Sequence, residues 1–165
     1  MQGGGMRRRI AAVAVLLLSA APAGAADNVK IGFVTTLSGP AGIIGKHMKD
    51  ASELSLSMLG GKVGGLPAQI VYGDDQQKPD IGRQVADEML KRDKVDFMTG
   101  IIWSNVMLAL YQPVIESGTM LISANAGPHE LAGEKCAPNF FSASWQNDQT
   151  PEAMGKFMDD QKMSD

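Results

Sequence analysis

The residues with the clearest chemical potential lie in two short loops, each of which follows an apolar run of strand length. Trp103-Ser104 comes shortly after residues 95–99, and Asn125-Ala126-Gly127 follows residues 120–123 after one intervening alanine. A serine hydroxyl at the start of a helix, with backbone amides in a small-residue loop, supplies donors suited to a carboxylate. The indole of Trp103 would add a flat apolar wall. Equally, the serine could only cap its helix and the tryptophan only fill the core.

Two neighbouring parallel strands are needed to bring these loops together. Residues 95–127 have the pattern of a buried strand, a helix and a second buried strand, with a connection of crossover length. Such a unit is right-handed, and the loops beyond its strands meet at one edge of the sheet, where open parallel sheets bind ligands. The first strand of the chain also ends near a hydroxyl, so the predicted ligand-binding residues are Ser38, Trp103, Ser104, Asn125, Ala126 and Gly127.

Apolar periodicity predicts alternating strands and helices along the rest of the chain. We expect strands at 28–35, 66–72, 95–99, 120–123 and 140–141, and helices at 42–59, from Pro79, from 104 to 117 and from Thr150. Beyond Gly127 the chain is expected to be irregular until the last strand. This order predicts an α/β fold, a doubly wound parallel sheet with helices on both faces.

Details of two helices follow from the same patterns. In the first helix, one stripe is expected to face the core, and it consists of Ile44, His47, Ala51, Leu54 and Met58. In the third helix, Ser104 is expected to be the N-cap, with Asn105 able to share that role. Pro113 is expected to kink or interrupt that helix, because it lacks an amide proton and its ring crowds the preceding turn.

The glycines after the first strand do not form a nucleotide-binding motif. They fall at Gly39, Gly42 and Gly45, so their spacing is G-x-x-G-x-x-G and not the dinucleotide fingerprint. A phosphate loop requires four residues between its glycines and a serine or threonine after the lysine, whereas His47 follows Lys46. No cofactor is therefore predicted.

Catalytic and metal-binding patterns are also missing from the sequence. Ser104 is not in a G-x-S-x-G elbow, and the two histidines, His47 and His129, do not have metal-ligand spacing. Asp74-Asp75 could resemble a metal or acid pair, but a role in a turn and in helix entry is favoured. We predict no catalytic residue, no metal site and no enzyme activity.

The N-terminal 25 residues have the pattern of a secretory signal peptide. Three arginines at positions 7–9 precede an apolar run at 10–18 and the small-residue site Ala23-Gly24-Ala25. The apolar run is too short to span a membrane, which requires ~20 apolar residues. Cleavage there would change the formal net charge from −3 to −6 and leave no basic stripe, which excludes nucleic acid and anionic membrane surfaces as expected partners. The single cysteine, Cys136, cannot form an internal disulfide and is expected to be a half-buried, unreactive side chain.

The sequence resembles the periplasmic solute-binding proteins of the branched-chain amino acid type, the leucine-binding-protein-like proteins that feed ABC importers. The motifs that carry this resemblance are residues 29–33 and 37–40, Asp74-Asp75, residues 100–104 and 120–123, and Glu130-Leu131. The resemblance implies a periplasmic protein with two α/β lobes that close on a ligand, whose partners are the permease and ATPase subunits of an importer. It also implies that Ser104 and the 125–127 loop hold the carboxylate of the ligand.

Family members that bind leucine or valine have a threonine hydroxyl at the position aligned with Gly127 and an aromatic residue at that of Ile44. Here both are absent. The loop at 123–128, with Phe140-Phe141 and residues 145–148, is more similar to members that serve aromatic or other organic acids. The ligand class expected from the resemblance is therefore a branched-chain amino acid or a related, possibly aromatic, carboxylate.

Members of the family are usually more than twice as long as these 165 residues. The resemblance implies a first lobe at 26–145 and the start of an interlobe crossover at 146–165, truncated there, in a protein expected to be monomeric at full length. Half of a two-lobed cleft leaves a ligand exposed, so the lone lobe is expected to bind weakly or not at all and to expose apolar surface. A periplasmic hydrolase and a sensory ligand-binding domain are the alternative functions.

Overall fold

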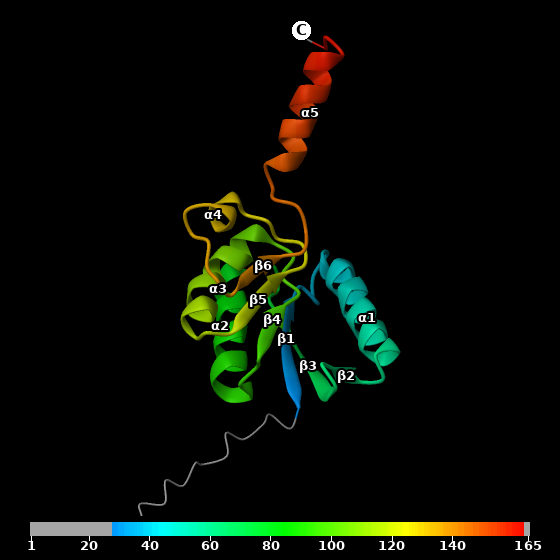
Figure 1. The fold of residues 1–165 in the computed structure, drawn as a ribbon, viewed down its shortest axis with the longest axis vertical. Helices are drawn as coiled ribbons and strands as arrows, with labels where there is room; N and C mark the ends of the chain where they lie inside the picture. Colours follow the sequence, from blue (N-terminus) through cyan, green and yellow to red (C-terminus); the bar gives the residue numbers. More distant parts are fainter. Residues whose placement is uncertain (1–27, 164–165) are drawn as a thin grey trace, which may run out of the picture.

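The computed structural model describes residues 28–163, so the expected signal peptide at residues 1–25 lies outside the described part of the chain. A six-stranded sheet with the order β2-β3-β1-β4-β5-β6 lies at its centre (Figure 1). The strands are β1 (Val29–Thr35), β2 (Lys62–Val63), β3 (Leu66–Asp74), β4 (Phe97–Thr99), β5 (Met120–Ser123) and β6 (Phe140–Ser142).

The helices alternate with these strands. They are α1 (Gly42–Met58), α2 (Pro79–Glu88), which continues as a π-helical turn at Met89–Asp93, α3 (Ser104–Glu116), the short α4 (His129–Ala132) and α5 (Gln149–Asp160). Helices α2 and α3 lie on one face of the sheet and α1 on the other, while α5 extends away from the sheet and has no buried residue (Figure 1). Within the described residues, no helix is both long enough and apolar enough to cross a lipid bilayer.

The predicted doubly wound parallel sheet is confirmed. Strands β3, β1, β4, β5 and β6 pair in parallel, whereas β2 pairs with β3 in antiparallel orientation through the two-residue hairpin loop Gly64-Gly65. The prediction missed β2 and α4, because elements of two and four residues are too short to show a period in the sequence.

The core lies between the sheet and the α2–α3 layer. Alternate residues of the strands point into it, and Val34, Met98 and Leu121 are fully buried. They meet the buried side chains Val106, Leu110 and Val114 of α3. This packing fixes α3 against β4 and β5, and it therefore fixes the position of the helix N-terminus at the sheet edge.

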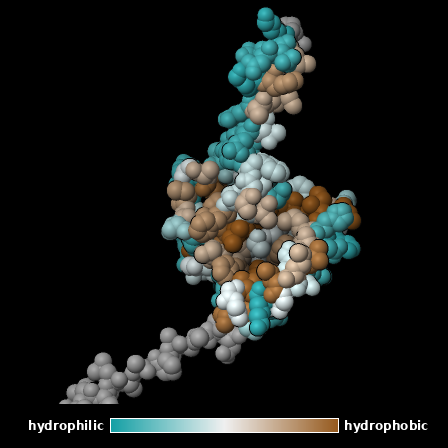
Figure 2. All heavy atoms as spheres, turned by 45° about the vertical axis from the view of Figure 1, so that its right-hand side comes forward, coloured by the Kyte–Doolittle hydropathy of each residue, from teal (hydrophilic) through white to brown (hydrophobic). Residues whose placement is uncertain are grey.

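The α1 face of the sheet is only partly covered. An apolar groove of about 280 Å³ separates α1 from the sheet and includes Phe33 and Leu56 in its lining. A neighbouring groove of about 230 Å³ lies over Phe97 and Ile122. Figure 2, in which the α1 side is turned forward, shows hydrophobic residues distributed over this side of the molecule. The expectation that the chain exposes apolar surface is thus confirmed.

The predicted orientation of α1 is wrong. Ile44, Leu54 and Met58 are 42%, 63% and 79% exposed, and His47 is exposed as well. The buried residues of α1 are instead Gly42 and Gly45. Because these glycines have no side chain, this face of the helix can approach the β1–α1 loop more closely than the face with the large apolar side chains could. The apolar stripe therefore remains on the outside.

Of the kink or interruption predicted at Pro113, the interruption is wrong, since α3 continues through the proline to Glu116. The proline lies only three residues before the end of the helix, so little of the hydrogen-bond ladder is lost. Val114, which is fully buried, and Ile115, which packs against the core, hold the last turn in place.

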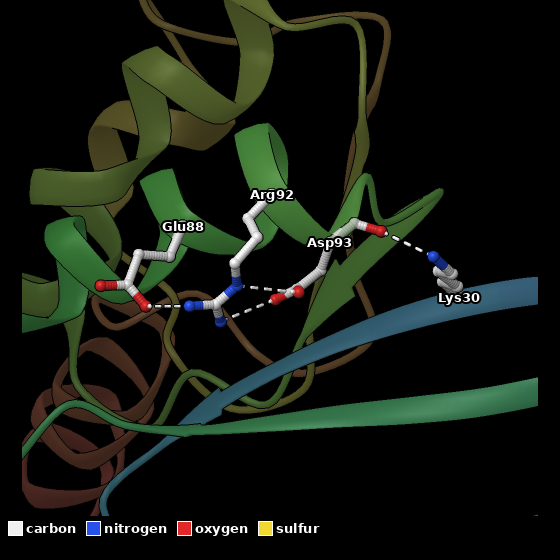
Figure 3. A network of polar contacts seen from close by, with 4 residues as sticks. All are labelled: Lys30, Glu88, Arg92 and Asp93. Atoms are coloured by element: carbon white, nitrogen blue, oxygen red, sulfur yellow. Dashed lines mark hydrogen bonds and ion pairs between the residues drawn. The ribbon is translucent and has the colours of Figure 1, made fainter.

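A charged cluster lies at the amino-terminal edge of the sheet, far from the loops that carry the predicted site. The Arg92 guanidinium contacts Asp93 at 3.1 Å and Glu88 at 3.2 Å, and Lys30 donates to the backbone oxygen of Asp93 (Figure 3). The hydrogen bond from Arg92 lowers the pKa of Asp93. Arg92 and Glu88 are exposed, and Asp93 and Lys30 are only half-buried, so the cluster contributes little to stability.

Candidate functional site

The two predicted loops lie side by side at the carboxyl edge of the sheet. The Asn125 side chain donates through Nδ2 to the backbone oxygen of Ile102 at 2.8 Å. The Ala126 amide donates to the backbone oxygen of Ile101 at 3.3 Å. The predicted placement of the β4–α3 and β5–α4 loops next to each other is therefore confirmed.

Ser104 is the first residue of α3 and not its N-cap. The N-cap position belongs to Trp103, which has extended backbone angles and no capping side chain, so the predicted cap is wrong. The side-chain oxygen of Asn105 accepts a hydrogen bond from the amide of Val106 at 3.0 Å. Ser104 Oγ accepts one from Asn147 Nδ2 at 3.0 Å and donates to no residue in 28–163. Its proton thus remains available for a ligand at the positive end of α3.

Trp103 is half-buried beside Ser104, and its indole is tied to the neighbouring β1–α1 loop. Nε1 donates to Thr36 Oγ1 at 2.9 Å, and Thr36 donates in turn to Asp75 Oδ1. The sequence predicts only a turn and helix-entry role for Asp75, and it predicts no contact of Trp103 with Thr36. The available signal was that Thr36 and Asp75 each follow the end of a strand, as Trp103 does. Their contacts could not be inferred from spacing, because Thr36 is 39 positions from Asp75 and 67 positions from Trp103.

The 125–127 loop has fewer backbone groups available to a ligand than its sequence suggests. Ala126 and Gly127 are buried, and the Ala126 amide is already bonded to Ile101. The backbone oxygen of Gly127 accepts from the Asn147 amide at 2.8 Å. A Cβ atom on Gly127 would lie 2.1 Å from the backbone oxygen of Trp145, so residues 145–147 pack directly over this loop.

The structure thus brings Trp103, Ser104 and Asn125 together, with Ala126 and Gly127 beneath them. Ser38 lies exposed on the adjacent β1–α1 loop, within reach of Asp74. A ligand-binding role for these six residues stays a prediction.

Asp74 and Asp75 have the predicted role in the turn before α2. Asp74 Oδ1 accepts from the Gln76 amide at 2.9 Å, and Asp75 Oδ1 accepts from the Gln77 amide at 2.8 Å. Both glutamines have positive φ, a conformation that such side-chain bonds stabilise.

Among residues 28–163, no group of three or more His, Cys, Asp or Glu residues has the geometry to hold a metal ion. Cys136 is exposed, which contradicts the expectation that it is half-buried.

The environment of Asp74 makes part of the stability dependent on pH. Partial burial favours a raised pKa, but hydrogen bonds from the Ser38 hydroxyl and from the Leu37 and Gln76 amides outweigh it and lower the pKa of Asp74. A lowered folded-state pKa adds stability that is present above the unfolded pKa and is lost as the pH falls through the folded value.

We therefore expect Asp74→Asn to lower the free energy of unfolding at neutral pH, with the difference from wild type shrinking as the pH falls below about 4. Urea denaturation at a series of pH values measures this difference. Asp159→Asn, on the exposed surface of α5, is the matched control and should show no such convergence. A difference for Asp74→Asn that does not change with pH contradicts the assignment.

Comparisons with known proteins agree on one kind of relative. The sequence matches the family described as periplasmic binding protein over residues 28–164. Leu/Ile/Val-binding protein homolog 6 of Brucella abortus is 30% identical over 127 residues, which are 75% of this chain and 32% of that protein. The chain thus spans about a third of the length of the curated relatives it matches.

Solved structures give the same result. A solute-binding protein of an ABC transporter from R. palustris, in complex with benzoate, is 30% identical with a TM-score of 0.75, and the match covers 79% of this chain and 36% of that one. A second such protein from R. palustris, in complex with 4-hydroxybenzoate, is 26% identical with a TM-score of 0.67, over 73% and 32% of the two chains.

Proposed function

Because the chain belongs to the periplasmic binding protein family, we propose that it forms the first lobe of the substrate-binding component of an ABC importer. In this role it captures a small organic carboxylate in the periplasm and delivers it to the permease and ATPase subunits. The protein is a binder and not an enzyme. The relatives named in the comparisons are binding proteins, and the two from R. palustris are solute-binding proteins of ABC transporters, which favours this function over a hydrolase or a sensory domain.

The observation that carries the proposal is the position of Ser104. Its hydroxyl lies in the first turn of α3, where the backbone amides and the helix dipole favour an anion. The Trp103 indole lies directly before it, and Asn125 is held against the same loop by its bond to Ile102. A carboxylate at the helix N-terminus would receive donors from Ser104 while its apolar part contacts the indole.

Aromatic acids are the favoured ligand class over branched-chain amino acids. The resemblance to leucine-binding members calls for a threonine at the position of Gly127, but any side chain there would require Trp145 and Gln146 to move. The Trp103 indole suits a flat ring, because aromatic groups pack well in offset or edge-to-face arrangements. Benzoate and 4-hydroxybenzoate are bound by the two R. palustris relatives.

A titration followed by NMR tests the proposal. We expect millimolar benzoate to shift the amide resonances of Ser104 and Asn125, leucine to shift them less, and neutral benzamide not to shift them. Benzoate recovered unchanged supports a binder, whereas a product would indicate an enzyme. Weak binding by the lone lobe is expected here rather than none, so absence of any shift with both acids contradicts the proposal.

Replacing Ser104 with alanine is expected to weaken benzoate binding by about tenfold or more, since a hydrogen bond to a charged group contributes ~1.5–3 kcal/mol. The matched control is Ser57→Ala, a serine on the exposed surface of α1, which should leave the affinity unchanged. The same titration measures both variants. Equal affinities for Ser104→Ala and wild type would exclude the hydroxyl as a carboxylate ligand.

A further inference from the structure

Thr36 and Asp75 lie outside the six residues predicted to bind ligand, yet they form a hydrogen-bonded chain with one of them. Trp103 Nε1 donates to Thr36 Oγ1 at 2.9 Å, and Thr36 Oγ1 donates to Asp75 Oδ1 at 2.5 Å. The three residues come from the loops after β4, β1 and β3. We propose that Thr36 and Asp75 are positioning residues that fix the orientation of the Trp103 indole toward the ligand, an inference that rests on the proposed function.

The direction of the chain follows from the chemistry of its members. An indole N–H can only donate, so Thr36 must accept from Trp103. The hydroxyl of Thr36 has one proton, and that proton is directed to Asp75. The two hydrogen bonds can therefore run only from Trp103 to Thr36 and from Thr36 to Asp75. The first of them fixes the N–H edge of the indole ring in place.

Asp75 is itself held rigidly. Its amide donates to the backbone oxygen of Thr35 at 3.0 Å, and its backbone oxygen accepts from the Lys78 amide at 2.8 Å. Its Oδ1 also accepts from Gln77. The carboxylate thus sits at a fixed position between β3 and α2, from which it can orient a hydroxyl on the neighbouring loop.

Burial indicates that this arrangement is more than a turn. Thr36 and Asp75 are both fully buried, and Asp75 Oδ2 has no hydrogen-bond partner within residues 28–163. Such an unpartnered buried oxygen lowers the stability of the fold. A turn requires only the bond from Oδ1 to Gln77, which the exposed side chain of an aspartate could make equally well. The buried connection to Thr36 is the contact that a turn does not explain.

As a consequence, the Trp103 indole is already ordered before a ligand binds. Trp103 is half-buried and packs against the core cluster, while its N–H is anchored to Thr36. An anchored ring loses little conformational freedom when it contacts a ligand, and this preorganisation favours binding. Without the anchor, the ring must be ordered at the moment of binding.

The test uses the full chain in a Trp145→Phe background, in which Trp103 is the remaining tryptophan of the two in the sequence. Thr36→Val removes the hydroxyl at nearly constant shape, and Thr36→Ser retains it. We expect Thr36→Val to move the indole N–H resonance of Trp103 toward that of a solvent-exposed indole and to weaken benzoate binding by roughly three- to tenfold. Thr36→Ser should restore both properties.

Asp75→Asn is a second variant, should Thr36→Val fail to fold. Its amide oxygen still accepts from Thr36, but less strongly than a carboxylate, so a smaller shift in the same direction is expected. An indole resonance that stays unchanged in the variants overturns the anchoring. A shifted resonance with unchanged benzoate affinity overturns the positioning role. If the wild-type protein binds no acid, the proposed function fails, while the indole resonance still decides whether Thr36 anchors Trp103.

Discussion

Replacing Gly45 with alanine should lower the free energy of unfolding by about 2–3 kcal/mol, the upper part of the usual cost of forcing an extra group into a packed contact. A Cβ atom there would lie 1.9 Å from the backbone oxygen of Thr36 and 2.7 Å from its carbonyl carbon. Backbone atoms cannot rotate out of the way, so α1 must move away from the β1–α1 loop. Urea denaturation followed by circular dichroism measures the loss.

Gly155→Ala is the matched control, because Gly155 also lies in a helix, α5. A Cβ at Gly155 meets no atom within 4 Å. Since alanine favours a helix over glycine by ~1 kcal/mol, this variant should be as stable as wild type or slightly more stable. Equal losses for the two variants would show that the close approach of α1 to Thr36 is not important for stability.

Replacing Leu110 with alanine should cost about 2–5 kcal/mol, the range seen when a large apolar side chain is removed from a core. Leu110 is fully buried in α3 and belongs to the cluster between α2, α3 and the sheet. Its loss removes apolar contact and leaves a cavity that the surrounding strands cannot fill. The midpoint of urea denaturation is expected to fall with little change in slope.

Leu54→Ala provides the comparison, since Leu54 is 63% exposed on α1. Surface substitutions of this kind usually change stability by less than ~0.5 kcal/mol. The pair therefore also tests the orientation of α1, for which the sequence predicted the opposite. A loss at Leu54 as large as that at Leu110 would mean that the apolar stripe of α1 is covered after all.

The strands and the larger helices were predictable because their burial is regular. Met98 and Leu121 lie in short apolar runs, and these runs alternate with segments of helical length, which is sufficient to indicate a doubly wound sheet. The orientation of α1 was not predictable in the same way. Hydrophobic periodicity assumes that the largest apolar side chains face the core, whereas Gly42 and Gly45 bury the opposite face by close backbone contact.

The candidate site was predictable at the level of loops and less so at the level of atoms. Parallel strands place their following loops at one edge, and this rule brought Trp103 and Asn125 together. The rule does not reveal which groups are already bonded within the protein, such as the Ala126 amide. It also does not reveal Thr36 and Asp75, because their contact depends on the packing of three loops that are distant in the sequence.

The strand order has a consequence for how the chain acquires its structure during synthesis. Strand β1, which is made before the other described strands, occupies an inner position between β3 and β4, and its Ile31 pairs with Phe97, 66 residues later. Long-range parallel pairing is slow, because the intervening chain must be ordered before the contact forms. The nascent N-terminal half therefore lacks one of the two neighbours of β1 until β4 has been made, and only then can the inner part of the sheet assemble.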